Sequence, residues 1–135
     1  MPIKTAKKSV AVQERVDESS ISKLTPEALS LMADFFKVLS EVSRLQIVCS
    51  LKASAKNVTE IIEETQLGQA NVSKHLKMLT QAGVVAREQR GVCVYYRIAN
   101  PFLFELCDLV FDALTMQAEQ QSQQLQQLSQ LRQNR

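Results

Sequence analysis

The chain of 135 residues is long enough for one domain with its own hydrophobic core, and 45% apolar with 22% charged residues is ordinary globular composition. The net charge is only +2, so any nucleic-acid surface must come from local clustering of basic residues. No apolar run approaches the ~20 residues of a membrane span, and the first 20 residues lack the apolar core of a secretory signal. We therefore expect a cytoplasmic protein without membrane contact. Its three cysteines are widely spaced and form no CxxC, which predicts reduced thiols.

The chain begins with a polar segment and then a helix. Residues 1–24 carry mixed charges and no apolar periodicity, which predicts a flexible N-terminal arm. Thr25-Pro26-Glu27 combines a capping hydroxyl, a first-turn proline and an acid, and so predicts a helix that runs to about Val38. Its apolar face would hold Leu29, Met32, Phe35 and Phe36.

Two short helices are expected next. The first runs from about Glu41 to Lys52 with Ser40 as its N-cap. Helical spacing turns four of its residues inward: Leu45, Val48, Cys49 and Leu51. The second runs from about Glu60 to Thr65, after a strand or turn at Val58 and a cap at Thr59. Because its exposed residues are acidic, this second helix should not enter a DNA groove.

A polar and basic helix follows the turn at residues 66–68. Gly68 would be its N-cap, and Gly83 would lie just past its C-terminus. The apolar face comprises Val72, Leu76, Leu79 and Ala82, and the other faces carry Gln69, Asn71, Ser73, Lys74 and Lys77. Amide, hydroxyl and ammonium groups suit the DNA major groove, where amides pair with adenine and ammonium groups meet guanine or phosphate. For this helix alone, an ordinary amphipathic surface helix is the alternative.

The chain then changes to the period of a β-hairpin. Val84 to Ala86 begins one strand, Val92 to Tyr96 alternates along another, and Arg90-Gly91 supplies the turn between them. Between Gln69 and Arg97 there is one acid, Glu88. The bases of this region are Lys74, Lys77, Arg87, Arg90 and Arg97. A basic hairpin after a polar helix predicts a winged helix-turn-helix whose wing meets the phosphate backbone. The alternative is an edge ribbon in which basic residues deter aggregation.

Asn100-Pro101 predicts the start of a last helix. Its apolar face is larger than a small core needs: Phe102, Leu103, Leu106, Leu109, Val110, Ala113 and Leu114. This surplus predicts a two-fold homodimer through the N- and C-terminal helices. From Met116 the chain is rich in Gln, and we expect helix to about Leu128, with a disordered tail as the alternative. The expected organisation is an arm (1–24), a mainly α winged helix-turn-helix domain with a β-hairpin wing (25–116) and a partly helical extension (117–135).

Three segments together resemble the ArsR/SmtB family of bacterial repressors. They are FFKVLSEVSRLQIVCSL (35–51), LGQANVSKHLKMLTQAGVV (67–85) and GVCVYYRI (91–98). The first is similar to the family's Ser-Asp-Pro-Thr-Arg-Leu but lacks the proline, and the second matches Val-Ser-(Arg/Gln)-His-Leu closely. The resemblance covers about residues 33–114. It implies a homodimeric repressor that binds a palindromic double-stranded DNA operator and releases it when an inducer binds.

The resemblance also implies where DNA is contacted. The family's base contacts fall at the start of the polar helix, here Gln69, Ala70, Asn71, Ser73 and Lys74, with His75 nearby. Lys77 and the hairpin residues complete the expected DNA-binding set: Arg87, Arg90, Gly91 and Arg97.

The family's metal-sensing motifs do not carry over. The helix at 60–65 has no cysteine, and the last helix has Asp108 and Asp112 but no histidine, so we expect no metal site. Cys49 matches a cysteine of family members that sense oxidants or sulfane sulfur, but Cys107 lies about two turns before the position of its partner there. Three interpretations stay open: small core residues, a Cys49–Cys107 thiol sensor, and cysteines that hold arsenite.

The sequence therefore predicts a DNA-binding transcriptional regulator. An enzyme is not expected, because the one histidine lies in the polar helix and no Gly-rich phosphate loop is present. The alternative is a protein-interaction module that uses the same scaffold without binding DNA.

Overall fold

A computed structural model describes residues 23–134, and the chain divides into two compact units, residues 1–39 and 40–135. The described helix of the first unit is α2 (Pro26–Leu39). It begins as predicted, because Thr25 Oγ1 accepts a hydrogen bond from the Ala28 N–H at 3.1 Å. None of its residues is buried. The arm predicted for residues 1–24 lies outside the described residues, apart from Lys23 and Leu24.

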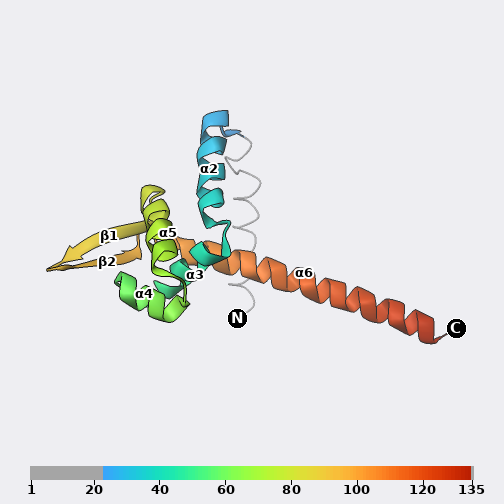
Figure 1. Ribbon diagram of the computed structural model, residues 1–135. Helices are drawn as coiled ribbons and strands as arrows, with labels where there is room; N and C mark the ends of the chain where they lie inside the picture. The colour runs from blue at the N-terminus through green and yellow to red at the C-terminus, as the bar shows by residue number, and fades with distance from the viewer. Residues whose placement is uncertain (1–22, 135) are drawn as a thin grey trace, which may run out of the picture. The chain divides into compact units, whose positions relative to one another are not determined.

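The second unit is mainly helical with one antiparallel hairpin, as predicted. In chain order its elements are α3 (Val42–Ser50), α4 (Val58–Thr65), α5 (Gln69–Gln81), β1 (Val85–Arg90), β2 (Cys93–Ile98) and α6 (Phe102–Gln133). Three residues join α4 to α5, and another three join α5 to the hairpin (Figure 1). The core lies where α3, α4 and α5 pack on one another and on the base of β1. Its apolar members are Ile47, Val48, Leu51, Ile61, Val72, Leu76, Leu79, Val84, Val85 and Leu103.

Helix α3 corrects two of our predictions. Its N-cap is Glu41 and not Ser40, and it ends at Ser50. Leu45 and Cys49 are exposed, whereas Arg44 is only 8% exposed. The buried stripe therefore runs through Arg44, Ile47 and Leu51 at helical spacing, so the adjacent face carrying Cys49 points outward. Arg44 is therefore buried where the apolar pattern had predicted that Leu45 would be buried.

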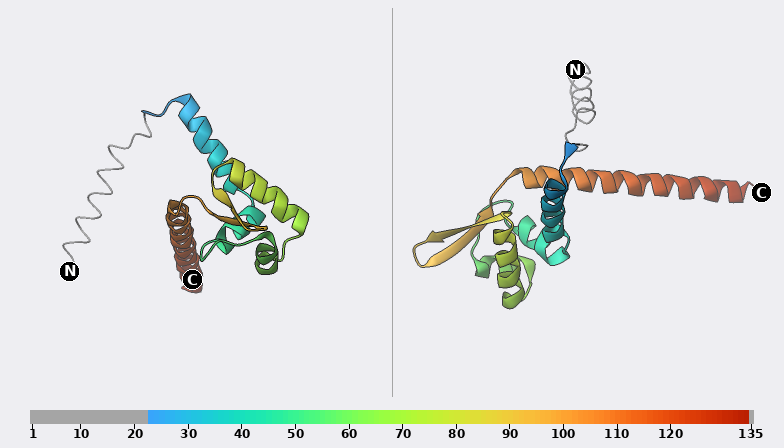
Figure 2. Two further views of the ribbon diagram at one scale, coloured as in Figure 1. Left: turned by 90° about the vertical axis from the view of Figure 1, so that its left-hand side faces the viewer. Right: turned by 90° about the horizontal axis from the view of Figure 1, so that it is seen from above.

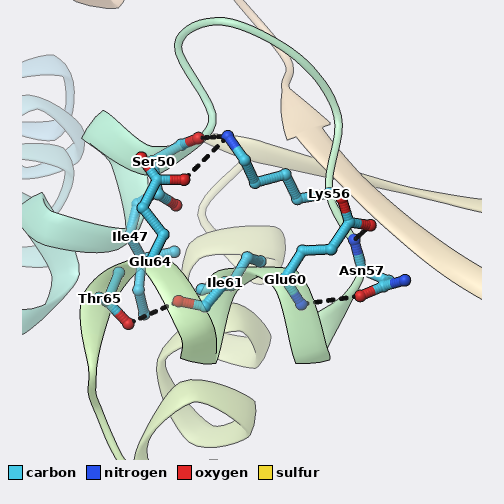
Figure 3. Close-up of polar contacts among 8 residues, drawn as sticks. All are labelled: Ile47, Ser50, Lys56, Asn57, Glu60, Ile61, Glu64 and Thr65. Carbon is cyan, nitrogen blue, oxygen red and sulfur yellow. Dashed lines mark hydrogen bonds and ion pairs between the residues drawn. The ribbon is translucent and has the colours of Figure 1, made fainter.

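Helix α4 starts earlier than predicted. Its N-cap is Asn57 and not Thr59, and Val58 is its first residue. Asn57 Oδ1 accepts from the Glu60 N–H at 2.9 Å while Glu60 Oε1 accepts from the Asn57 N–H at 3.3 Å, which forms a capping box (Figure 3). Lys56, just before the cap, lies against both the Ser50 carbonyl and the Glu64 carboxylate. These contacts fix the segment between α3 and α4 onto both helices.

The hairpin is tied to the helices at its base. Val85 pairs with Ile98 and Arg90 with Cys93, and Gly91-Val92 forms the turn with Gly91 at φ 62°. The positive φ at Gly91 is as predicted, but the turn lies one residue later than the predicted Arg90-Gly91, because Arg90 pairs with Cys93 and Val92 belongs to the turn. Lys56 and Tyr96 exchange backbone hydrogen bonds of 3.0 and 2.8 Å, so the α3–α4 connection adds a bridge to the edge of β2. This bridge fixes the hairpin relative to the helices.

Helix α6 leaves the other elements of residues 40–135 and continues alone (Figure 2). Asn100 Oδ1 accepts from the Phe102 N–H at 3.0 Å at its start. Of its 32 residues only Leu103 is buried, while Lys52 Nζ lies 5.8 Å from the centroid of the Phe104 ring. The helix extends five residues beyond Leu128, where we expected it to end, and reaches Gln133. No helix within residues 23–134 has the length and hydropathy needed to cross a membrane.

Candidate nucleic-acid interface

The start of α5 presents an exposed polar surface. Gly68 caps the helix in an extended conformation (φ −68°, ψ 150°) without a side-chain hydrogen bond. The first N–H groups of α5 therefore have no side-chain cap, and such groups are suited to bind an anion such as phosphate. The exposed residues of its first turns are those predicted to meet DNA: Gln69, Ala70, Asn71, Ser73, Lys74 and Lys77.

His75 is the exception among the predicted DNA-contacting residues of α5. Its side chain lies on the buried face between Val72 and Leu79 and is only 6% exposed. Nε2 is 3.4 Å from Glu41 Oε1, and Nδ1 has no hydrogen-bond partner among the described residues. The structure thus corrects its expected role: His75 packs α5 against the start of α3, and its imidazole is not available to a DNA base.

The same carboxylate also holds Arg44. Glu41 Oε2 lies 2.8 Å from Arg44 Nη1, and this guanidinium also donates to Met78 Sδ at 3.7 Å. Glu41 therefore links a buried arginine of α3 with a buried histidine of α5. This link orients α5. Neither Glu41 nor Arg44 was singled out as functional from the sequence, since the contacts of Glu41 with His75 and of Arg44 with Met78 join distant segments.

The predicted basic residues of the wing divide between the two faces of the hairpin. The register places Arg87 opposite Tyr96 and Ala86 opposite Arg97. Residues paired across a ladder share a face and successive residues alternate, so Arg87 and Arg97 point to opposite faces. Arg90 shares the face of Arg97.

The face with Arg87 continues the exposed surface of α5. A hollow of about 220 Å³ lies between helix and wing and is lined by Ser73, Lys77, Thr80, Gln81, Arg87 and Tyr96. It brings two cations and several hydroxyl groups together, which is the donor chemistry that binds a phosphate. Thr80, Gln81 and Tyr96 were not predicted from the sequence. Helical spacing from Ser73 and Lys77 could have indicated the first two, whereas Tyr96 depends on the hairpin register.

Arg90 lies near the tip of the wing. Its Nη2 is 3.2 Å from Glu88 Oε2, and its guanidinium carbon lies 4.7 Å from the centroid of the Tyr95 ring. These contacts hold an exposed side chain in one orientation, next to the turn at Gly91. The guanidinium is planar and offers five donors, so it can still bind a phosphate from this position.

The thiols occupy three different elements. Cys49 on α3 and Cys93 on β2 are exposed, and Cys107 on α6 is half-buried. Burial raises the pKa of the Cys107 thiol, and the nearby charges of Cys49 and Asp108 raise it further. The charge of a Cys49 thiolate therefore acts on Cys107, but Cys49 is not the buried core residue that we predicted. Within residues 23–134 no three His, Cys, Asp or Glu side chains gather where they could hold a metal ion.

These features define a class of protein. Helix α4, a tight turn, an exposed polar and basic α5 and a basic hairpin are the parts of a winged helix-turn-helix, in which the second helix enters the major groove and the wing lies beside it. The fold predicted from the sequence is confirmed.

Comparison with known proteins gives the family. Residues 41–87 match the family described as "Bacterial regulatory protein, arsR family". The chain is 34% identical over 93 residues to the HTH-type transcriptional repressor SmtB of Mycobacterium tuberculosis, covering 69% of this chain and 67% of that protein. The chain belongs to the ArsR family of DNA-binding transcriptional regulators, which are not enzymes.

Solved structures agree with this assignment. The crystal structure of M. tuberculosis Rv0081 superposes with a TM-score of 0.65 at 30% identity, covering 73% of this chain and 98% of that one. The homodimeric winged helix-turn-helix DNA-binding domain of Mycobacterium bovis Mb0332 superposes with a TM-score of 0.58 at 32% identity, covering 62% and 81%.

Proposed function

We propose that this chain is a sequence-specific transcriptional repressor that binds a palindromic DNA operator as a homodimer and is released by an inducer. The observation that carries the proposal is the continuous surface from the uncapped start of α5, through the hollow, to Arg87 on the wing. A helix that enters the major groove beside a phosphate-binding wing would use all parts of this surface at once.

Base recognition is assigned to the first turns of α5. Gln69 and Asn71 offer amides that pair with adenine, Ser73 and Lys74 offer a hydroxyl and an ammonium group, and Ala70 offers a methyl that can contact thymine. These side chains are exposed, and α5 is oriented by the Glu41 contacts on its other face. They are proposed to determine which sequence is bound.

Backbone binding is assigned to the basic residues around the wing. Lys77 and Arg87 line the hollow and would share one phosphate. Arg90, Gly91 and Arg97 would meet the backbone or the minor groove on the other face of the wing. Contacts of this kind bring affinity and salt dependence but little sequence preference.

Homodimerisation is supported by the uncovered apolar surface of α6. Val110 is 52%, Phe111 69% and Leu114 58% exposed, in a stretch too apolar to remain in water. The relative Mb0332 is a homodimer in this fold. Two-fold symmetry would present two α5 helices to successive major grooves, as a palindromic operator requires.

The inducer is proposed to act on the thiols of Cys49 and Cys107. Cys49 is exposed to an incoming oxidant, and its charge acts on Cys107, which lies on the helix assigned to the dimer. A peroxide would take two electrons from the two thiols, giving one disulfide and two waters. The test is operator release by peroxide, polysulfide, arsenite and zinc for the parent and Cys49→Ser, with Cys93→Ser as the control. Release of the parent and Cys93→Ser by peroxide, but not of Cys49→Ser, supports the thiol sensor; equal release of all three proteins rejects it.

A gel shift tests DNA binding itself. The full chain should retard random duplex DNA at low salt, and an operator selected from a random pool should remain bound at a salt concentration that releases random duplex. Absence of retardation at low salt would contradict the proposal and favour a protein-interaction module on the same scaffold.

A further inference from the structure

Lys56 joins three elements of the second unit through its side chain and its backbone. Its ammonium group contacts the carbonyl of Ser50, the last residue of α3, and lies 3.1 Å from Glu64 Oε2 on α4 (Figure 3). Its N–H and carbonyl exchange hydrogen bonds with Tyr96 on β2. The Lys56 side chain is only 15% exposed. Its ammonium group is thus engaged within the protein, unlike those of the exposed basic residues that are proposed to meet DNA.

The side chain of Lys56 helps to determine where its backbone lies. The last carbonyls of a helix have no partner within the helix, and the helix dipole attracts a cation to them. The Ser50 carbonyl and the Glu64 carboxylate therefore hold one ammonium group from two helices. Residues 52–54 of the connection between these helices are exposed, so its position depends on the contacts of Lys56 and on the capping box at Asn57.

The backbone of Lys56 is the first member of a row that crosses the wing. Tyr96 is paired with Lys56 on one side and with Arg87 on the other. Tyr96 and Arg87 both line the hollow, and Lys77 lines it from α5. A shift of the Lys56 backbone would therefore move Tyr96 and Arg87 relative to Lys77. Two cations bind one phosphate together only when the structure holds them at a suitable separation.

We propose that Lys56 is a positioning residue for DNA binding: held by Ser50 and Glu64, it sets where the wing places Arg87 beside Lys77. The inference rests on the proposed function and extends it, because it assigns part of the DNA affinity to a lysine that does not contact phosphate. Glu64 has the same role through Lys56. An acidic residue ordinarily weakens DNA binding, but this one strengthens it by holding Lys56 in place.

A pair of charge-matched substitutions in the full chain tests this reversal of sign. Glu63 and Glu64 are exposed neighbours on α4, and the ion pair with Lys56 is made by Glu64. Fluorescence anisotropy with random duplex DNA at low salt measures affinity. Glu63→Gln should bind as tightly as the parent or more tightly, because a negative charge is lost. Glu64→Gln should bind about 3- to 5-fold more weakly, the contribution of one partly exposed ion pair. Equal affinities of Glu63→Gln and Glu64→Gln would overturn the proposal.

A double-mutant cycle tests whether Glu64 acts through Lys56. Lys56→Met should weaken binding by about 10-fold and lower the salt slope by about one, although Lys77 and Arg87 are unchanged. Lys52→Met removes the same charge from the same connection and should lose much less affinity. Adding Glu64→Gln to Lys56→Met should cause no further loss, because the partner is already absent. Additive losses in the double variant would show that the two residues act separately and would overturn the proposal.

Amide hydrogen exchange without DNA measures the position of the wing directly. The Tyr96 N–H donates to the Lys56 carbonyl at 2.8 Å, and the Val84 N–H donates to the Leu79 carbonyl at 3.0 Å. In Lys56→Met the Tyr96 N–H should exchange about 10-fold faster while the Val84 N–H is unchanged. Unchanged exchange at Tyr96, or equal acceleration at both amides, would overturn the proposal. A parent chain that does not bind DNA, with the expected exchange at Tyr96, would reject the proposed function only.

Discussion

Lys74 and His75 are neighbours on α5 with opposite environments. Lys74 is exposed on the surface of α5 that is proposed to meet DNA, and His75 is 6% exposed beside Glu41. Both belong to the segment that resembles the family pattern, but a successive pair on a helix is separated by 100° and so faces different surroundings. A pattern match therefore does not distinguish a ligand-binding residue from one that positions it.

The pair gives a matched prediction. His75→Ala should lower the free energy of unfolding by about 1–3 kcal/mol, because it leaves a cavity and removes the Glu41 contact. Lys74→Ala should leave the free energy of unfolding unchanged within about 0.5 kcal/mol and weaken DNA binding. Urea denaturation and fluorescence anisotropy measure the two effects. A lower free energy of unfolding for Lys74→Ala, with no change for His75→Ala, would contradict these roles of the two residues.

The three cysteines are expected to differ in the reactivity of their thiols. Burial, Cys49 and Asp108 all raise the pKa of Cys107, so its thiol stays protonated at neutral pH and is a poor nucleophile. Iodoacetamide should therefore modify Cys49 and Cys93 first, and the rate at Cys107 should rise only at alkaline pH, above the range of an ordinary thiol. Peptide mass spectrometry after timed quenching measures each site. Fastest modification at Cys107 near neutral pH would contradict the environment described here.

Among the elements, those with local signals were predictable and those held by distant contacts were not. Thr25-Pro26 begins α2 and Gly91 takes the positive φ of the wing turn, both as the sequence indicated. Asn57 was missed because Thr59 offers an equally good capping hydroxyl nearby, and only the capping box with Glu60 decides between them. The buried face of α3 was wrongly predicted at Arg44, because the burial of this arginine depends on its contacts with Glu41 and Met78.

The residues of the candidate site also differ in how far the sequence could predict them. The exposed residues of α5 could be read from helical spacing, because one apolar stripe fixes which side points outward. The separation of Arg87 from Arg97 could not, since it depends on the hairpin register and on the bridge between Lys56 and Tyr96.

The two faces of the wing predict different roles for its arginines. Arg87→Ala should weaken binding to all sequences and reduce the salt slope by about one, because Arg87 and Lys77 line the hollow beside α5. Arg97→Ala, on the opposite face of β2, should have a smaller effect on both quantities. Anisotropy titrations at several salt concentrations compare them. A larger loss of DNA affinity for Arg97→Ala than for Arg87→Ala would indicate that the DNA backbone lies on the face of the wing that carries Arg97.

Over the whole molecule, a net charge of +2 leaves little general attraction for DNA. Binding must depend on the local surface that α5 and the wing form together, repeated by the two-fold symmetry proposed through α6. Sequence recognition is proposed for α5, and association of two copies is proposed for α6.

The central claim is that the start of α5 selects the DNA sequence. The most direct measurement is the ratio of affinities for the selected operator and a scrambled duplex, compared between the parent, Asn71→Ala and a Gln123→Ala control. We expect Asn71→Ala to lower this ratio by about 10- to 100-fold for each half-site, the worth of one bidentate amide–base pair, while Gln123→Ala leaves it unchanged. An unchanged ratio in Asn71→Ala, and in the same substitution at Gln69, would show that α5 does not read the operator.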